Sequence, residues 1–156
     1  IANKLQKKGF PVTFDSMMKN LNDIAGVRVI CPYISDIYSV RDMLLKQPDL
    51  TLIKQNDYIE EPKESGYRSL HLVMEIPVYL SKTEHHVRVE IQLRTIAMDF
   101  WASLEHEMRY KKDLTEEISQ SISAQLLDCA TTITETDSKM QDIKNQIYPN
   151  YPESVM

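Results

Sequence analysis

The sequence contains few residues of the kinds that hold phosphates through the backbone or cross-link a fold. Its 156 residues include only three glycines and two cysteines. The three scattered glycines exclude a glycine-rich phosphate loop of the P-loop or dinucleotide-binding type. Side chains must therefore hold any bound phosphate. Cys31 and Cys129 show neither a CxxC motif nor metal-ligand spacing, and we expect both to be small buried residues in a reducing cytoplasm.

Long apolar runs are also missing. We find no signal peptide and no long uncharged apolar stretch, so we expect neither export nor a membrane span. The composition, 42% hydrophobic and 26% charged, is typical of a single globular domain. The net charge of −5 argues against a surface built for nucleic acid, although Lys4, Lys7 and Lys8 form a local basic cluster.

The periodicity of apolar residues predicts an α+β fold. Alternating and helical patterns, with their turn signals, set the expected boundaries of the elements. Helices are expected over 1–8, 14–21, 36–46, 96–112 and 116–147, and strands over 24–31, 50–59, 69–80 and 86–95. This order implies a mixed sheet with helices on at least one face. In the fourth helix we expect an apolar stripe of Ala97, Trp101, Leu104 and Met108.

The last predicted helix is long and carries a nearly heptad apolar stripe. At 1.5 Å per residue it would span about 50 Å, more than one small domain can cover. We expect part of it to contact a second subunit; the alternative is packing along its own domain throughout. The stripe comprises Ile118, Ile122, Leu126, Cys129, Ile133, Met140, Ile143 and Ile147.

The fourth strand has one wholly apolar face and one wholly polar face. Its polar residues are Arg88, Glu90, Gln92 and Arg94. An antiparallel strand with one solvated face gives the same pattern. Asp23, just before the first strand, would approach Glu90 if the first and fourth strands were neighbours. Two close carboxylates repel unless a cation lies between them, and Mg²⁺ prefers oxygen ligands and substrate phosphates.

Four segments together carry a resemblance to a known family. They are 23–28 (DIAGVR), 57–71 (DYIEEPKESGYRSLH), 89–95 (VEIQLRT) and 97–106 (AMDFWASLEH). In this order they resemble the synthetase domain of the RelA/SpoT homologues, over about residues 1–112. The short chain with a helical C-terminus resembles a small stand-alone alarmone synthetase of the RelQ type. The His-Asp dipeptide of the family's hydrolase domain is absent, so we do not expect hydrolase activity.

The resemblance implies a nucleotidyltransferase-like mixed sheet flanked by helices, with a synthetase domain over 1–112 and a C-terminal helical oligomerisation extension over 113–156. It implies transfer of the β,γ-pyrophosphate of ATP to the 3′-hydroxyl of GDP or GTP, releasing AMP, in the stringent response. Asp23 and Glu90 would bind Mg²⁺, and Glu90 would also be the base that takes the proton of the 3′-hydroxyl.

The resemblance also implies the nucleotide contacts. On the ATP side Arg28 would stack on the adenine and Lys7 would meet the phosphates, with Lys4 and Lys8 as neighbours. The residues implied for GDP or GTP are Lys63, Tyr67, His71, Gln92 and Glu105, with Tyr67 stacked on guanine and Lys63 and His71 on the phosphates. For His71 the alternative is a satisfied core histidine, and for Glu105 a solvated helix residue.

The family has a further basic segment just upstream, whose arginine covers the other side of the adenine. This chain begins at Ile1, so we expect that segment among residues that precede it. By resemblance the protein is a homotetramer, and single-stranded RNA remains open as a regulator. Two other functions remain open: a non-catalytic nucleotide-sensing or RNA-binding module, and a nucleotidyltransferase that releases pyrophosphate. The Asp23 and Glu90 pair favours the synthetase.

Overall fold

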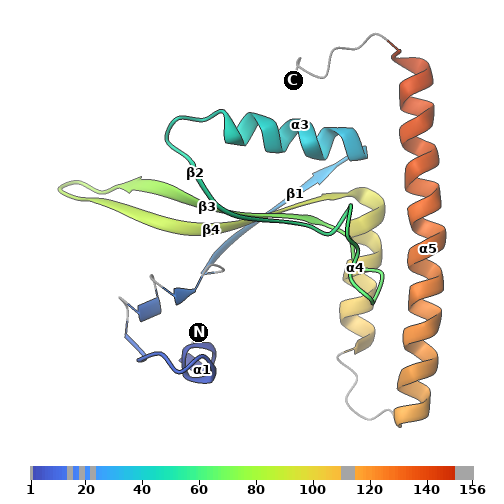
Figure 1. The fold of residues 1–156 in the computed structure, drawn as a ribbon, viewed down its shortest axis with the longest axis horizontal. Coiled ribbons are helices and arrows are strands. Elements are labelled where there is room, and N and C mark those ends of the chain that lie inside the picture. The colour runs from blue at the N-terminus through green and yellow to red at the C-terminus, as the bar shows by residue number, and fades with distance from the viewer. Residues whose placement is uncertain (1, 14–15, 18–19, 22–23, 110–114, 150–156) are drawn as a thin grey trace. The chain divides into compact units, whose positions relative to one another are not determined.

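A computed structural model describes residues 2–13, 16–17, 20–21, 24–109 and 115–149 (Figure 1). The predicted order of elements is confirmed over these residues, whereas the helix expected over 14–21 falls partly outside them. The helices are α1 (Ala2–Lys7), α3 (Ile34–Leu45), α4 (Ile96–Arg109) and α5 (Glu116–Ile147). The strands are β1 (Ala25–Cys31), β2 (Thr51–Asp57), β3 (Leu70–Tyr79) and β4 (Glu84–Thr95).

The four strands form one sheet in the order β1-β4-β3-β2. The first and fourth strands are therefore neighbours, which is the condition for an approach of Asp23 to Glu90, and the α+β class is confirmed. The β3–β4 hairpin closes through the Leu80 backbone N–H, which donates to the Thr83 carbonyl at 2.8 Å. Because this bond closes the turn early, β4 begins at Glu84, two residues before the expected start.

The chain divides into two compact units, which we describe separately. The first unit comprises Ile1–Val29, Asp42–Asn56 and His71–Gln92, and the second Ile30–Arg41, Asp57–Leu70 and Leu93–Met156. The buried apolar side chains of the first unit are Leu5, Leu21, Leu72, Val73, Met74 and Ile91. The predicted boundary between a synthetase domain and an oligomerisation extension lies within 110–114, outside the described residues, and stays a prediction.

Helix α1, in the first unit, ends where the sequence predicts. Gly9 adopts φ +73°, and its N–H donates to the Gln6 carbonyl at 3.0 Å. The Phe10 N–H then donates to the Leu5 carbonyl at 3.0 Å. A glycine in the left-handed conformation just after the last turn is a common helix terminator, because it has no Cβ to clash.

In the second unit α4 and α5 lie side by side (Figure 1). Trp101 and Ala102 of α4 form a buried cluster with Leu126 and Ala130 of α5. The Trp101 indole N–H donates to the Leu126 carbonyl at 2.9 Å. The stripe expected on α4 is therefore wrong in part: Leu104 and Met108 are exposed, and Met98 and Ala102 are buried in their place.

Helix α5 has the predicted bounds, and the Thr115 hydroxyl caps its first turn by accepting from the Ile118 N–H. Its buried residues are Leu126, Ala130 and Asp137, with Ile122 and Ile133 packed against the cluster. Cys129 is exposed, so its predicted burial is wrong, whereas Cys31 is buried as expected. Cys129 lies on a part of the helix surface that α4 does not cover.

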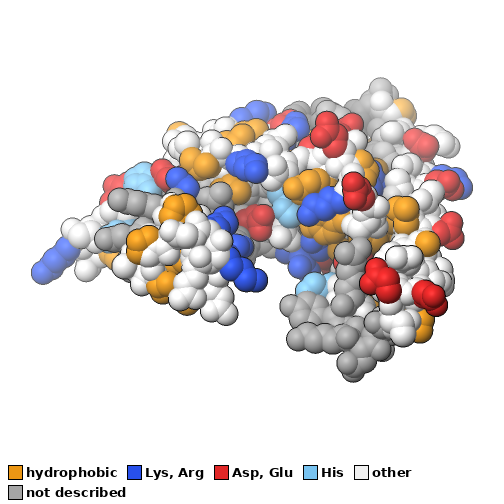
Figure 2. Space-filling model, turned by 60° about the horizontal axis from the view of Figure 1, so that its bottom comes forward, with side chains coloured by type: hydrophobic (Ala, Val, Ile, Leu, Met, Phe, Trp, Pro, Cys, Tyr) orange, Lys and Arg blue, Asp and Glu red, His pale blue; other side chains and the backbone are white. Residues whose placement is uncertain are grey.

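The ends of α5 leave apolar side chains uncovered. The exposed ones are Ile118, Leu127, Met140, Ile143 and Ile147. Figure 2 shows single hydrophobic side chains among acidic ones at the right of the view, over α5. Near its C-terminal end Lys144 donates to the Ser35 hydroxyl at 2.8 Å and to the buried Asp36 carboxylate, at the start of α3. In the described part of the chain, no helix has the length and apolar character needed to cross a membrane.

Candidate active site

Three of the predicted site residues meet on the sheet of the first unit. The Glu90 Oε1 atom on β4 lies 3.1 Å from Nδ1 of His71 on the neighbouring β3. Gln92 donates from Nε2 to the other Glu90 oxygen, Oε2, at 3.2 Å. Alternate residues of a strand share a face, which is why Glu90 and Gln92 lie together. The structure thus brings together three residues that the sequence named separately, while their roles toward a nucleotide stay predictions.

The Glu90 carboxylate is partly exposed and can accept further partners. Its side chain is 24% exposed and that of His71 is 11% exposed. An ionised carboxylate offers about four lone-pair sites. The contacts with His71 and Gln92 occupy one site on each oxygen, so the group can still accept a proton or bind a cation. His71 is buried and lies beside the Glu90 carboxylate, so a satisfied core histidine and a nucleotide ligand both agree with its surroundings.

The start of β1 passes beside Glu90. A Cβ built on Gly26 would lie 3.8 Å from the Glu90 carbonyl oxygen. Asp23 is two residues before the first residue of this strand and lies outside the described residues, so the predicted carboxylate pair stays a prediction. Among the residues that the structure describes, no group of three or more His, Cys, Asp or Glu could hold a metal. The carboxylate of Glu90 nevertheless fits Mg²⁺, which takes one or two protein carboxylates alongside phosphates and water.

The residues predicted for ATP also belong to the first unit. Lys4 and Lys7 are exposed in α1, Lys8 is exposed just after it, and Arg28 is exposed on β1. Positive side chains in these places can approach a polyanion without a desolvation cost. Their shared contact with ATP stays a prediction.

The second unit contains the loop between β2 and β3, which carries Lys63 and Tyr67. The Tyr67 hydroxyl accepts a 2.7 Å hydrogen bond from Arg94 Nη2, and Arg94 Nη1 donates to Asp99 Oδ1 at 3.0 Å. Arg94 is buried, so the alternative of one solvated polar face does not describe this end of β4. The reason is that Tyr67 and Asp99, from the loop and α4, supply the partners that a buried guanidinium requires.

The Lys63 side chain lies over two aromatic rings. Its Nζ is 4.5 Å from the ring centroid of Tyr58 and 4.7 Å from that of Tyr67. The two rings meet edge to face with centroids 6.0 Å apart. The loop closes on itself, because the Gly66 N–H donates to the Lys63 carbonyl at 2.8 Å and the Lys63 N–H to the Tyr67 carbonyl at 3.2 Å. The loop thus holds the Lys63 ammonium group over the face of the Tyr67 ring.

A carboxylate network holds the beginning of this loop. Asp57 Oδ1 accepts from the backbone N–H groups of Ile59 and Glu60 at 3.0 and 3.2 Å. The Tyr38 hydroxyl oxygen lies 3.1 Å from Asp57 Oδ2 and 3.2 Å from Glu60 Oε1, so its one proton is shared between two carboxylate acceptors. Burial raises the pKa of Tyr38 above its ordinary value, and the two carboxylates raise it further. The phenol therefore stays protonated and remains a donor.

Glu105 lies half-buried on α4, in the same unit. Its predicted contact with the acceptor nucleotide stays a prediction, as does that of Gln92.

Comparison with known proteins agrees with this arrangement. The family described as "Region found in RelA / SpoT proteins" matches residues 1–115. The chain belongs to the RelA/SpoT family. Among RelA/SpoT relatives, it is 47% identical to the GTP pyrophosphokinase YwaC of Bacillus subtilis (strain 168) over 147 residues, which cover 94% of this chain and 69% of the relative. It is 38% identical to the GTP pyrophosphokinase YjbM of the same organism over 147 residues, covering 94% and 67% of the two chains.

Solved structures of this family share the fold. The crystal structure of the small alarmone synthetase 1 from Bacillus subtilis bound to its product pppGpp matches with a TM-score of 0.80 and 38% identity. The match covers 93% of this chain and 72% of that one. The resemblance stated from the four sequence segments, and the α+β fold with a long C-terminal helix that it implies, are therefore confirmed.

Sequence reasoning did not assign a site role to Arg94, Asp99 or Ala130. Two features of the sequence could have indicated that Arg94 is buried and paired. Arg94 is a charged residue at the end of a strand, within the segment 89–95 that carries the family resemblance. Asp99 follows it by five residues on the next helix, where an acid can pair with the arginine. No sequence pattern indicated that α5 would lie against the loop of Tyr67.

Proposed function

We propose that this RelA/SpoT family member is a GTP pyrophosphokinase that makes the alarmone (p)ppGpp. It transfers the β,γ-pyrophosphate of ATP to the 3′-hydroxyl of GDP or GTP and releases AMP, in the stringent response. The observation that carries the proposal is the Glu90 cluster on β4: a half-buried carboxylate, held by His71 and Gln92, in a chain 47% identical to a GTP pyrophosphokinase.

In this reaction the 3′-hydroxyl oxygen of the acceptor bonds to the β-phosphorus of ATP. The bond from that phosphorus to the bridging oxygen of the α-phosphate breaks, and AMP leaves with the electron pair. Glu90 takes the hydroxyl proton. A carboxylate is a weak base in water, but positioning supplies much of the rate in phosphoryl-type transfer. The contacts with His71 and Gln92 fix the direction of the carboxylate.

Glu90, together with Asp23, would hold Mg²⁺. When bound, the ion neutralises charge on the ATP phosphates. The position of β1 beside β4, and of Gly26 beside the Glu90 carbonyl, supports this pairing, because Asp23 is two residues before the start of that strand in the sequence.

The side chains of the acceptor loop suit a guanine nucleotide. Tyr67 offers an aromatic ring held at its hydroxyl by Arg94, and a purine can stack on such a ring. Lys63, from the same loop, supplies a positive charge for phosphates, and we assign His71 to the same task. Arg28 and the lysines Lys4, Lys7 and Lys8 are assigned to ATP. Gln92 and Glu105 are assigned secondary contacts with the acceptor.

We further propose a cytoplasmic homotetramer. The exposed apolar side chains at both ends of α5 support self-association, since a second copy would cover them. Regulation by single-stranded RNA stays a possibility that the resemblance raises. Sedimentation at high protein concentration tests the assembly, and a monomeric mass would contradict it.

The experiment that tests the proposed activity identifies both products. The protein is incubated with ATP, GDP and Mg²⁺, and nucleotides are separated by anion-exchange chromatography. We expect equimolar AMP and guanosine tetraphosphate. Release of pyrophosphate with retention of the AMP moiety on the acceptor would indicate a different nucleotidyltransferase. Binding of GDP without any product from a folded protein would indicate a non-catalytic module.

A further inference from the structure

The surface of α5 that faces the acceptor loop lies outside the region that defines the family. The family match ends at residue 115, whereas α5 begins at Glu116. Nevertheless α5 contributes Ala130 and Leu126 to the cluster on which Tyr67 packs. The helix therefore contacts the segment that presents the acceptor's aromatic partner.

The closest approach is between Gly66 and Ala130. A Cβ built on Gly66 would lie 2.5 Å from the Ala130 Cβ, at which the atoms overlap, and 3.3 Å from Leu127 Cδ1, which is a tight contact. Gly66 also adopts φ +86°, a conformation that favours glycine. The loop backbone thus lies directly against the helix, immediately before Tyr67, with no room for a side chain at position 66.

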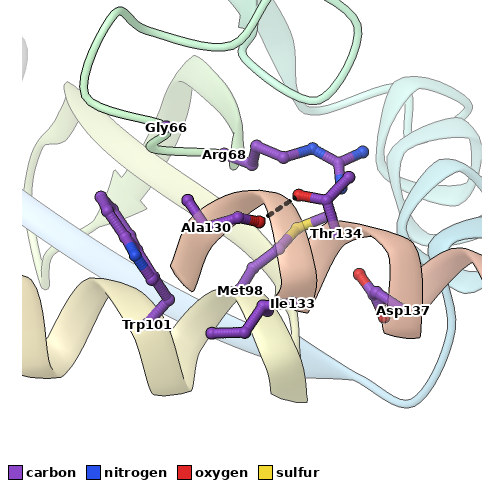
Figure 3. Close-up of a pocket in the computed structure, with 8 residues that line it drawn as sticks. All are labelled: Gly66, Arg68, Met98, Trp101, Ala130, Ile133, Thr134 and Asp137. Carbon is purple, nitrogen blue, oxygen red and sulfur yellow. Dashed lines mark hydrogen bonds between the residues drawn. The ribbon is translucent and has the colours of Figure 1, made fainter. Parts of the chain in front are cut away.

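Polar contacts extend this interface along the helix. The Thr95 hydroxyl, at the end of β4, donates to Asp137 Oδ2 at 2.8 Å, and both residues are buried. Arg68, the residue after Tyr67, lies with Asp137 and Thr134 around a small cavity (Figure 3). The guanidinium donates to the Ile59 carbonyl at 3.5 Å, and its Nε and Nη1 are buried without a hydrogen-bond partner among the described residues.

The cavity itself is too small to be a nucleotide site. Its volume is ≈ 10 Å³, near the lower limit for a single water molecule. Figure 3 shows that Ala130, Ile133 and Thr134 of α5 line one side of it and that Gly66 and Arg68 of the loop line another. The contact between loop and helix is thus nearly filled around Ala130, and a larger side chain at this position must move one of the two elements.

We infer that α5 positions the acceptor loop, and that Ala130 is a positioning residue for guanine-nucleotide binding through Gly66 and Tyr67. This inference rests on the proposed function, because it assigns Tyr67 to the acceptor base. The small side chain at position 130 sets how close the loop backbone lies to the helix. The loop backbone in turn sets where the Tyr67 ring stands.

The first test enlarges Ala130 and measures the KM of each substrate. In Ala130→Leu we expect the KM for GDP to rise about tenfold or more, because displacement of a binding group by about 1 Å is costly. The KM for ATP, kcat at saturating GDP and the mass of the assembly should stay as in the wild type. Thr131→Leu, on the exposed neighbouring position of α5, is the matched control and should leave both KM values unchanged. Equal rises in both KM values, or a normal KM for GDP in a folded Ala130→Leu protein, would overturn the inference.

A rescue experiment decides the matter should Ala130→Leu fail to fold. Gly66→Ala adds the Cβ that meets Ala130, so it should raise the KM for GDP. Adding Ala130→Gly removes the atom that it meets and should restore part of the lost affinity, although the backbone strain at position 66 remains. A double variant no better than Gly66→Ala would overturn the inference. Wild-type turnover separately decides the proposed function, because the two KM comparisons have meaning only for an active enzyme.

Discussion

Glu90 and Tyr67 have the largest parts in the proposed reaction, and the structure holds them by different means. Glu90 stands on a strand, and its two described contacts come from the same strand and the adjacent one. Tyr67 stands on a loop, and its contacts come from β4, α5 and its own loop. Regular strand pairing therefore determines the surroundings of Glu90, whereas the packing of a loop against other elements determines those of Tyr67. The following variants break or sharpen this contrast.

Glu90→Gln should have the largest effect. It removes the proposed base and one proposed metal ligand while keeping the shape of the side chain. We expect kcat for alarmone synthesis to fall by about a thousandfold, because a positioned base contributes about 10²–10⁴-fold. The thermal unfolding midpoint should stay close to that of the wild type. Glu84→Gln, on the exposed start of the same strand, is the control and should keep full activity. Wild-type turnover in Glu90→Gln would refute the assigned role.

Tyr67→Ala should act on acceptor binding and not on the chemical step. Loss of a stacked ring weakens base binding by about 1–3 kcal/mol, so we expect the KM for GDP to rise about 10- to 100-fold. Tyr67→Phe keeps the ring and is the matched control. Its KM should stay near the wild-type value, although the buried Arg94 loses a hydrogen-bond acceptor and the free energy of unfolding should fall by about 1–3 kcal/mol. Steady-state kinetics with GDP varied would reveal an unchanged KM in Tyr67→Ala, which would contradict the assignment.

Lys63→Met should separate the two tasks of the loop. The ammonium lies over the Tyr67 ring, so a stacking base must compete with it. We expect GDP to bind more weakly, because the phosphates lose a positive charge. Guanosine, which has no phosphate, should bind about two- to fivefold more tightly, since a cation–π contact of about 0.5–1 kcal/mol no longer opposes it. Equilibrium titrations of GDP and guanosine test these opposite changes in affinity. Equal weakening of both would contradict competition between Lys63 and the base for the Tyr67 ring.

Asp137→Asn should have the smallest effect, on the pH dependence of stability. Burial raises the pKa of the Asp137 carboxyl above 3.8 and outweighs the Thr95 hydrogen bond and the Arg68 charge, which lower it. The folded state therefore binds the proton more tightly than the unfolded state. The stability from this group is present below pH 3.8 and is lost as the pH rises through the folded pKa. Urea unfolding of the wild type and Asp137→Asn should be measured from below pH 3.8 upward. The free energy of unfolding of the variant should rise relative to that of the wild type as the pH increases. An equal pH dependence in the two proteins would exclude Asp137 as the cause.

The sequence predicts the features that depend on a single element, among them the strand face on which Glu90 lies. Strict alternation along 87–94 placed Glu90 and Gln92 on one face, and the apolar pattern predicted the observed bounds of α5. Such patterns depend only on the period of each element. They also predicted that part of α5 would remain uncovered, which the exposure of Ile118 and Ile147 agrees with.

The surroundings of Tyr67 and its loop could not be predicted in this way. The burial of Arg94 depends on Tyr67, which is 27 residues away in sequence. The face of α4 that is buried, and the exposure of Cys129, depend on which side of each helix meets the other. The contact of Gly66 with Ala130 joins two segments whose sequences show no shared pattern. Periodicity is a property of a single helix or strand, whereas these features depend on how two elements pack together.

The measurement that tests the account most directly is titration calorimetry of GDP into two variants. The account assigns chemistry to Glu90 and acceptor binding to Tyr67. It predicts that Glu90→Gln binds GDP with the wild-type Kd while forming no alarmone, and that Tyr67→Ala binds GDP far more weakly. Wild-type affinity in Tyr67→Ala, together with lost affinity in Glu90→Gln, would contradict it.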